Sequence, residues 1–427
     1  MSHPAEFVLL GIPDVNGSIR GKALRPHAFE SAVRQGTVMT DLLLGIDPVD
    51  APITDFDRFG IRTGAADLVV HPDEGTRHEL AWRPGWSICL ATPSWPDGSP
   101  CELATREVYR GVLEGVSADG FEVMAALEYE IRLWDSDGRP LSSGLSYSLV
   151  EIGRYLEFVD RLVPALDHLG IELSAVHTEA GPGLLELNLG PRRGLRAADD
   201  AALVKFAVKD LASTMGMKAS FLAKTNPGEE GSSGHVHMSF WSGETNAFAG
   251  AAANDPAPAA LSSAIAGVLE HLPAASLLLN PTMNSYKRLV PGWFAPVNAT
   301  WGYENRSCAL RAIRSERKEL WRFECRRPGA DANPYLALAA IAAAAADGVK
   351  REAQPPEPLV GDAYAADVPE LPGSLEASLA AFEADDAFRA AVGKTFAEYY
   401  SVTRAWELKA WRETVTDWER DRYERSV

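Results

Sequence analysis

The stretch Asn280–Arg327 reads NPTMNSYKRLVPGWFAPVNATWGYENRSCALRAIRSERKELWRFECRR, and its last part is the pattern from which we interpret the chain. In Arg322-Phe323-Glu324-Cys325-Arg326, charged and apolar residues alternate. Successive side chains of a β-strand point to opposite faces, so a strand here would place Arg322, Glu324 and Arg326 on one face. A carboxylate between two guanidinium groups is suited to a metal-bound phosphate.

The same period of two occurs in Glu128-Tyr129-Glu130 and in His235-Val236-His237. A single pair of this kind is also compatible with a structural salt bridge, and an arginine cluster is often a solvated face. Three strands that each present a pair of metal-type or phosphate-type ligands are much harder to obtain by accident. We therefore predict that the three segments contribute to one metal-nucleotide site.

The composition describes a globular protein with ample material for a large core, because 46% of the 427 residues are hydrophobic. Counting 41 Lys and Arg against 59 Asp and Glu gives 41 − 59 = −18, which argues against a nucleic-acid or anionic-membrane partner. The four cysteines show no CxxC spacing, as expected for a reducing cytoplasm. We see no signal peptide and no membrane span, since the alanine-rich run near 337–347 is too short, and we predict a cytoplasmic protein.

The first hundred residues resemble a small mixed domain with several strands. Residues 6–12 are strand-like, and Asp14–Ser18 supplies a turn before residues 19–22, which together indicate a hairpin. Further short apolar runs lie at residues 42–45, 68–70 and 87–91. The turn formers of residues 93–100 would not be tolerated by a helix or a central strand, so we place the domain boundary there. The predicted domains are residues 1–100 and 101–427.

The larger part alternates strands and helices. A long β-rich run at residues 121–135 carries Glu128 and Glu130, whose burial is costly unless a cation neutralises them. Glycines flank Pro182 in a predicted turn that could bring Glu179 and Glu186 together. We expect a strand at residues 171–177 and helices at residues 107–118, 156–170 (kinked at Pro164), 199–217 and 334–348 and from residue 397 onward.

The predicted convergence involves five glutamates and a histidine: Glu128, Glu130, Glu179, Glu186, Glu324 and His235. Oxygen-dominated ligands with one imidazole favour Mg²⁺ or Mn²⁺ over Zn²⁺, and six ligands suggest two or more ions. Metals together with guanidinium groups would neutralise a transferring phosphoryl group; the arginines in question are Arg288, Arg306, Arg311, Arg322 and Arg326. The chain has no Walker-A loop and no GxGxxG motif, which excludes P-loop and dinucleotide enzymes.

These motifs resemble the glutamine synthetase family nearly end to end. The segments that carry the resemblance are DVNGSIRGK, TGAADLVVHPD, SSGHVHMS, NPTMNSYKRLVPG, NRSCALR, RFECR and ANPYLALAA. The resemblance implies an α+β protein with an N-terminal β-grasp domain and a catalytic α/β domain containing a half-barrel of antiparallel strands. It also implies a homo-oligomer, commonly a dodecamer of two hexameric rings, with each site at a subunit junction.

The resemblance further implies ATP-dependent activation of the γ-carboxylate of L-glutamate to γ-glutamyl phosphate, followed by attack of an amine. One metal would be held by Glu130, Glu179 and Glu186, and the metal on the ATP side by Glu128, His235 and Glu324. Glutamate would be bound by Gly231, Arg288 and Arg326, and the nucleotide and phosphates by His237, Ser239, Arg306, Arg311 and Arg322. Arg306 and Arg326 would act on the transferred phosphate as catalytic residues.

The sequence departs from the family where ammonium binds. Ammonia-using members read RLVPGYEAP, whereas this chain reads RLVPGWFAP, so Phe294 stands in place of a glutamate that contacts ammonium. The family's DGSS stretch, whose aspartate also contacts ammonium, has no clear counterpart. A small cation without anionic partners binds poorly, because it does not recover its lost hydration. We therefore hypothesise a larger primary amine as the nucleophile, with an acceptor pocket formed by Tyr147, Trp293 and Phe294.

Further departures concern the substrates. Leu184 replaces a glutamine of the GQxE turn, Glu230 an asparagine that often contacts glutamate, and Glu319 a lysine that often approaches ATP. Two alternatives stay open: an ordinary ammonia-dependent glutamine synthetase, and a non-catalytic scaffold member of the family. The scaffold is less favoured, since it has no need to keep mutually repelling carboxylates together.

Overall fold

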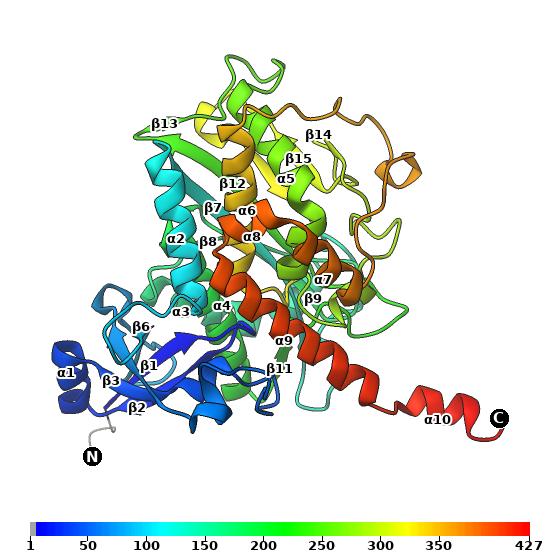
Figure 1. Ribbon diagram of the computed structural model, residues 1–427. Coiled ribbons are helices and arrows are strands. Elements are labelled where there is room, and N and C mark those ends of the chain that lie inside the picture. Colours follow the sequence, from blue (N-terminus) through cyan, green and yellow to red (C-terminus); the bar gives the residue numbers. More distant parts are fainter. Residues whose placement is uncertain (1–5) are drawn as a thin grey trace.

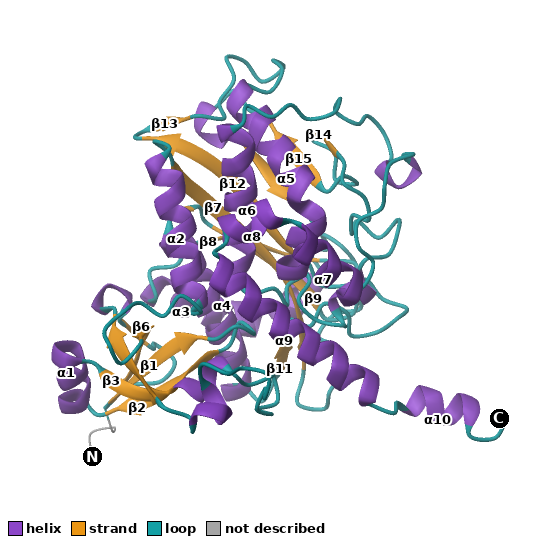
Figure 2. Ribbon diagram, in the orientation of Figure 1, coloured by secondary structure: helices purple, strands orange, loops and turns teal. Residues whose placement is uncertain are grey.

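Two β-sheets organise residues 6–427, the part of the chain that the computed structural model describes (Figures 1 and 2). The first sheet has the order β2-β1-β6-β4-β3, with β5 paired to β6. Its strands are β1 (Phe7–Pro13), β2 (Ile19–Leu24), β3 (Thr37–Thr40), β4 (Asp67–Pro72), β5 (His78–Glu79) and β6 (Trp86–Ser94).

The second sheet is the larger one and has the order β14-β15-β16-β12-β7-β9-β8, with β10 and β11 paired to β7 and β13 to β12. Its strands are β7 (Glu122–Trp134), β8 (Leu173–Thr178), β9 (Leu184–Leu189), β10 (Arg192–Arg193), β11 (Lys218–Ser220), β12 (Gly234–Ser242), β13 (Thr245–Asn246), β14 (Trp301–Tyr303), β15 (Leu310–Ile313) and β16 (Arg322–Cys325). All of its pairings are antiparallel except that of β14 with β15. The predicted α+β class with a curled half-barrel sheet is confirmed.

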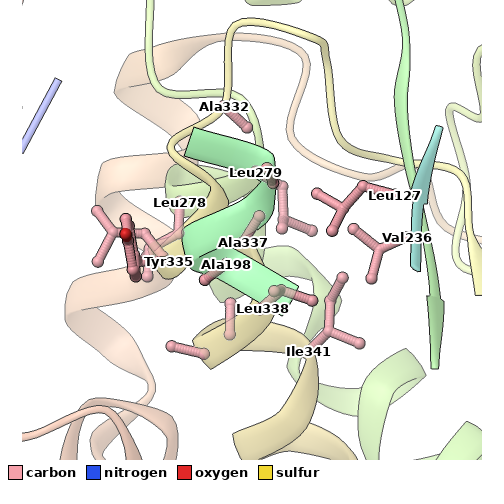
Figure 3. Close-up of a cluster of buried hydrophobic side chains, with 14 of the residues drawn as sticks. Leu127, Ala198, Val236, Leu278, Leu279, Ala332, Tyr335, Ala337, Leu338 and Ile341 are labelled. Atoms are coloured by element: carbon pink, nitrogen blue, oxygen red, sulfur yellow. The ribbon is translucent and has the colours of Figure 1, made fainter. Parts of the chain in front are cut away.

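The helices are α1 (Pro26–Gln35), α2 (Thr105–Ala118), α3 (Leu156–His168), α4 (Leu195–Thr214), α5 (Ala259–Leu279), α6 (Pro334–Lys350), α7 (Leu375–Ala384), α8 (Asp386–Ala391), α9 (Lys394–Glu413) and α10 (Asp417–Tyr423). Of these, α2, α4, α5 and α6 contact the apolar face of the second sheet, whereas α1 packs on the first sheet (Figure 1). Figure 3 shows Leu127 of β7 and Val236 of β12 among apolar side chains of α6, including Leu338 and Ile341. Because strand side chains alternate, the neighbours of these apolar residues in sequence point to the opposite face of the sheet.

Helix α5 is long and apolar enough to cross a bilayer by length and composition alone, a feature that the sequence analysis overlooked. In the structure, 83% of its most apolar window is buried inside the protein, as expected for a core helix.

Two sequence predictions in the N-terminal region were wrong. The apolar run 42–45, which the sequence analysis counted towards the strands of this region, instead lies in a 3-10 helix at Asp41–Leu44 and its C-cap Gly45; the Thr40 side chain caps the start by accepting a hydrogen bond from the Leu42 amide. The turn predicted at residues 93–100 also starts two residues too early, because β6 continues through Pro93 and Ser94. Pairing of β6 with β1 ends at Leu90, so Pro93 has a strand partner on one side only and its missing N–H is tolerated.

The predicted hairpin of residues 6–22 is present as β1 and β2, and Asp14 accepts hydrogen bonds from the amides of Asn16 and Ser18 in its turn. The same turn is attached to distant parts of the chain. Asn333 caps the N-terminus of α6 with its side-chain oxygen and donates from its side-chain nitrogen to the Asp14 carbonyl at 2.9 Å. Arg404 of α9 donates to the Asn16 side chain at 3.1 Å. The division of the chain at residue 100 stays a prediction.

Helices α5 and α6 approach each other closely at Gly267 and Gly348. A Cβ at Gly267 would lie 2.2 Å from the Ala344 carbonyl oxygen, and one at Gly348 would lie 2.1 Å from the Ser263 carbonyl oxygen. Both contacts are with backbone, which cannot move aside as a flexible side chain can. The close packing of these two helices therefore depends on glycine.

We predict that Gly267→Ala lowers the free energy of unfolding by ~1–3 kcal/mol, because the added methyl group overpacks the contact between α5 and α6. Gly111→Ala is the matched control: Gly111 lies in α2, and a Cβ there meets nothing within 4 Å. It should be neutral or stabilising by up to ~1 kcal/mol, since alanine is the better helix former. Urea unfolding at one fixed protein concentration measures both, and equal effects of the two changes would contradict the packing argument.

Candidate active site

A cavity of about 600 Å³ lies on the polar face of the second sheet. Of the residues singled out from the sequence, it is lined by Glu128, Glu130, Tyr147, Glu179, Glu186, Gly231, His235, His237, Trp293, Phe294, Arg306, Arg311, Arg322, Glu324 and Arg326. The predicted convergence of the three period-two segments is therefore present, with β7, β12 and β16 as its strands.

Strand register explains how these side chains meet. Glu130 of β7 is paired with Glu186 of β9, which is in turn paired with His177 of β8. On the other side, Glu128 is paired with His235. Antiparallel partners on one face have neighbouring side chains, so rows of polar groups cross the sheet.

A third row runs through Glu324, which is paired with His237 on one side and with Arg311 on the other. Ligand atoms of Glu128, His237 and Glu324 lie within 4.8 Å of one another. His237 Nε2 is 2.9 Å from a Glu128 oxygen, and His235 Nδ1 is 3.5 Å from oxygens of both Glu128 and Glu324. Both histidines therefore face the same pair of carboxylates.

Glu324 is completely buried between two arginines. Arg326 donates to one of its oxygens at 2.6 Å and Arg311 to the other at 2.8 Å. Burial alone would raise the pKa of Glu324, but the charges of Arg326, the two histidines and Arg311 outweigh burial and lower the pKa to about 2. The Glu324 carboxylate is therefore ionised, and the arginines that flank it face the cavity.

A second cluster consists of His177, Glu179 and Glu186, whose ligand atoms also lie within 4.8 Å of one another. His177 Nδ1 is 3.1 Å from Glu179, and His177 Nε2 is 3.0 Å from Glu186. Burial alone would lower the pKa of His177, but hydrogen bonds to the two glutamates and their charges outweigh it and raise the pKa to about 10. Glu186 Oε1 also accepts a hydrogen bond from Asn188 at 2.8 Å.

Glu130 lies in the same row and is partly buried in the cavity wall. Its carboxylate accepts a hydrogen bond from the Ser233 amide at 2.7 Å. Burial, followed by the charges of Glu186 and Glu179, raises the pKa of Glu130 to about 8. Crowded carboxylates of this kind repel one another, and a divalent cation would offset that repulsion.

The donor set fits hard divalent cations, since carboxylate oxygens dominate both clusters. His235 Nε2 is in addition buried and has no hydrogen-bond partner within residues 6–427. A buried nitrogen without a hydrogen-bond partner is the kind of ligand atom that a metal or a substrate satisfies.

Two of the predicted site residues do not line this cavity. Ser239 lines an adjoining cavity of about 210 Å³, which shares Glu128, His237 and Arg322 with the main one and also reaches Glu319. Arg288 is buried, and its side chain packs so tightly under Gly231 that a Cβ there would lie 2.3 Å from Arg288 Cγ. It donates to the Ser233 hydroxyl at 3.2 Å, so it supports the cavity floor.

The predicted acceptor residues Tyr147, Trp293 and Phe294 all line the cavity. Tyr147 and Phe294 are 68% and 58% exposed, respectively, which is unusual for large aromatic side chains. Both have left-handed backbone conformations, with φ of +54° for Tyr147 and +53° for Phe294. Strained non-glycine residues of this kind concentrate at functional sites.

The loop that carries Glu230 is fixed by hydrogen bonds from Arg132 and Lys224. Arg132 is buried and donates to the Glu229 side chain at 2.8 Å and to the carbonyls of Pro182 and Glu230. Lys224 donates to the Glu229 carbonyl and lies 4.0 Å above the centre of the Trp293 ring. The fixed loop leaves the Glu230 side chain in the cavity wall.

Sequence reasoning missed several cavity residues: Ser146, His177, Ala180, Asn188 and Ser233. His177 could have been found, because His177-Thr178-Glu179 has the same spacing of two as the three segments that were used. Asn188 follows Glu186 with this spacing as well. The two loop residues Ser146 and Ala180 carry no periodic signal.

Comparison with known proteins agrees with this geometry. The family model described as glutamine synthetase, catalytic domain, matches residues 102–423. The chain is 33% identical to γ-glutamylethanolamide synthetase GlnA4 of Streptomyces coelicolor, over 97% of this chain and 91% of that protein. It is 32% identical to glutamate–isopropylamine ligase of Pseudomonas sp, over 99% and 95% of the two chains.

Glutamine synthetases are similar to nearly the same degree; that of Thermus thermophilus is 33% identical over 98% of this chain and 95% of its own length. Among solved structures, a GmaS/ADP complex superposes with a TM-score of 0.87 at 25% identity, covering 98% of this chain and 96% of that one. The chain therefore belongs to the glutamine synthetase family of ATP-dependent carbon–nitrogen ligases.

Proposed function

We propose that this protein joins the γ-carboxylate of L-glutamate to a primary amine other than ammonia, through a γ-glutamyl phosphate intermediate, at the expense of ATP. The observation that carries the proposal is the Phe294 ring in the cavity wall. Relatives named for ethanolamide and isopropylamine products are consistent with it.

Phe294 determines the polarity of the acceptor side. Its ring stands where ammonia-using members place a glutamate, in a loop turned by the positive φ of Gly292 (+83°) and of Phe294 itself (+53°). An aromatic ring offers apolar surface to the carbon atoms of an amine and no charge to a free ammonium ion. Tyr147 and Trp293 line the same cavity and would complete the acceptor wall.

The two carboxylate clusters would hold the metals, as Mg²⁺ or Mn²⁺. Glu128, Glu324 and an imidazole from His235 or His237 would bind the ion on the nucleotide side, and Glu130, Glu179 and Glu186 the other. When bound, such ions neutralise the oxygens of a transferring phosphoryl group.

The arginines around Glu324 would act on the phosphates. Arg306 and Arg326 would stabilise the charge on the transferred group, while Arg311 and Arg322, with His237 and Ser239, would bind the nucleotide. Gly231 and Arg326 would contact glutamate, with Arg288 supporting it from the cavity floor. The depressed pKa of Glu324 and the raised pKa of the Arg326 guanidinium beside it keep both groups charged for this task.

A ring-shaped homo-oligomer, as in a dodecamer, belongs to the same proposal. Exposed apolar side chains beside the cavity, such as Leu149 and Val150, support it, because large apolar surfaces usually mark contacts between chains. Light scattering coupled to size-exclusion chromatography gives the number of subunits.

An ammonia-dependent glutamine synthetase is the alternative that a specific observation favours, namely the equal similarity to the Thermus thermophilus enzyme. A scaffold without activity is a weaker alternative. The repulsion among Glu130, Glu179 and Glu186 destabilises the fold, and a protein that binds no metal would gain nothing from it.

We predict that Glu324→Gln weakens Mn²⁺ binding by at least about 100-fold and abolishes measurable turnover, because the ion loses a carboxylate that binds it directly. Glu304→Gln is the matched control, because Glu304 also pairs with Arg311, at 3.4 Å, but lies outside the cavity wall. Its metal affinity and its kcat should stay within about twofold of the parent. Calorimetric Mn²⁺ titration and phosphate release measure both; unchanged metal binding in Glu324→Gln would show that the ligand assignment is wrong.

We predict that ATP-dependent phosphate release in the presence of glutamate is faster with alkylamines or ethanolamine than with ammonium. Phe294→Glu should shift the ratio of kcat/KM values towards ammonium by about tenfold or more, since one ion pair in a dry site has that magnitude. Phe294→Leu is the control that keeps an apolar side chain, and it should preserve the preference for amines. Preference of the parent protein for ammonium would overturn the proposed function.

A further inference from the structure

His177, near the end of strand β8, contacts both the carboxylates and an aromatic side chain of the cavity wall. His177 contacts Glu179 and Glu186 through its two ring nitrogens, at 3.1 and 3.0 Å. The strand register, in which His177 is the partner of Glu186, fixes this arrangement in the backbone. Asn188 shares Oε1 of Glu186 with His177, which leaves the other carboxylate oxygen free for a ligand.

The flat face of the same imidazole supports the acceptor wall. The Tyr147 ring stacks on His177 with ring centres 4.3 Å apart and planes inclined by 14°. The Tyr147 ring lies at the cavity surface, so His177 is the aromatic group that backs it.

The backbone around Tyr147 is attached to the residue that follows His177. The Tyr147 amide donates to the Thr178 carbonyl at 2.8 Å, and the Ser148 amide donates to the Thr178 hydroxyl at 3.0 Å. That hydroxyl donates to the Leu145 carbonyl at 2.8 Å. These bonds support the positive φ of Tyr147, and from this backbone position its ring lies face to face with His177.

We propose that His177 is a positioning residue that links the metal-binding carboxylates to the amine-acceptor wall. Its nitrogens fix the orientation of Glu179 and Glu186, and its ring face fixes Tyr147. The half of the proposal that concerns the acceptor rests on the proposed function; the half that concerns the metal does not.

The two contacts use different properties of the imidazole, so substitutions can separate them. Phenylalanine keeps a flat ring for Tyr147 but offers no hydrogen bond. Asparagine places an amide nitrogen near the position of Nδ1, which contacts Glu179, and glutamine places one near Nε2, which contacts Glu186. Neither amide provides a ring.

The experiment measures Mn²⁺ binding by calorimetry in the absence of turnover, and the KM for the best amine at saturating metal. We expect His177→Phe to weaken Mn²⁺ binding by about 10–100-fold and to leave the amine KM within about twofold. His177→Asn and His177→Gln should retain metal binding better than His177→Phe and raise the amine KM by roughly three- to tenfold, through loss of the stack.

His168 provides the matched control. It is exposed on α3, and its Nδ1 lies 2.8 Å from the Pro164 carbonyl of its own helix. His168→Phe and His168→Asn should change neither metal binding nor the amine KM. Circular dichroism and the unfolding midpoint establish that each variant is folded before it is compared.

Parallel losses in all three variants would overturn the proposal, because a purely structural role moves both readouts together. Equal loss of metal binding in the asparagine, glutamine and phenylalanine variants would also overturn it, since the imidazole would then be a metal ligand itself. If ammonium proves to be the nitrogen substrate, the difference in metal binding between the phenylalanine and the amide variants is still expected, so the two proposals fail independently.

Discussion

The structure depends on the desolvation of negative charge on one face of a curled sheet. Glu130 and Glu324 line the same cavity, yet their pKa values move in opposite directions, to about 8 and about 2. The difference arises because Arg326 and Arg311 surround Glu324, whereas the neighbours of Glu130 are Glu186 and Glu179. One side of the cavity therefore has two arginines beside its carboxylate, whereas the other crowds Glu179 and Glu186 around the imidazole of His177 with Glu130 next to them.

Strand register provides the geometry that makes this charge pattern useful. The apolar side chains of β7, β12 and β16 pack in the core with those of α5 and α6 (Figure 3). This packing fixes the strand register, because a slip of one residue would turn the carboxylates into the core. The apolar core and the polar site are thus two faces of one set of strands. Changes deep in the helix layer act on the site through this register.

The sequence predicted the part of the site that lies on strands, because a period of two is visible in residues such as Glu128 and Glu130. It failed where position depends on loops and caps. Residues 42–45 are apolar enough for a strand, but the Thr40 cap starts a 3-10 helix instead. The floor position of Arg288 and the stack of Tyr147 on His177 depend on tertiary contacts that no local pattern carries.

The turn between β1 and β2 has a consequence for how the chain can be divided. Asn333 starts α6 and at the same time binds the carbonyl of Asp14, and Arg404 binds Asn16. A fragment without the first hundred residues would leave these polar groups without their partners at the beginning of α6. The first hundred residues thus stabilise the N-terminus of α6 and part of α9 through these hydrogen bonds. A truncated protein made to study the larger part alone would have to fold without them.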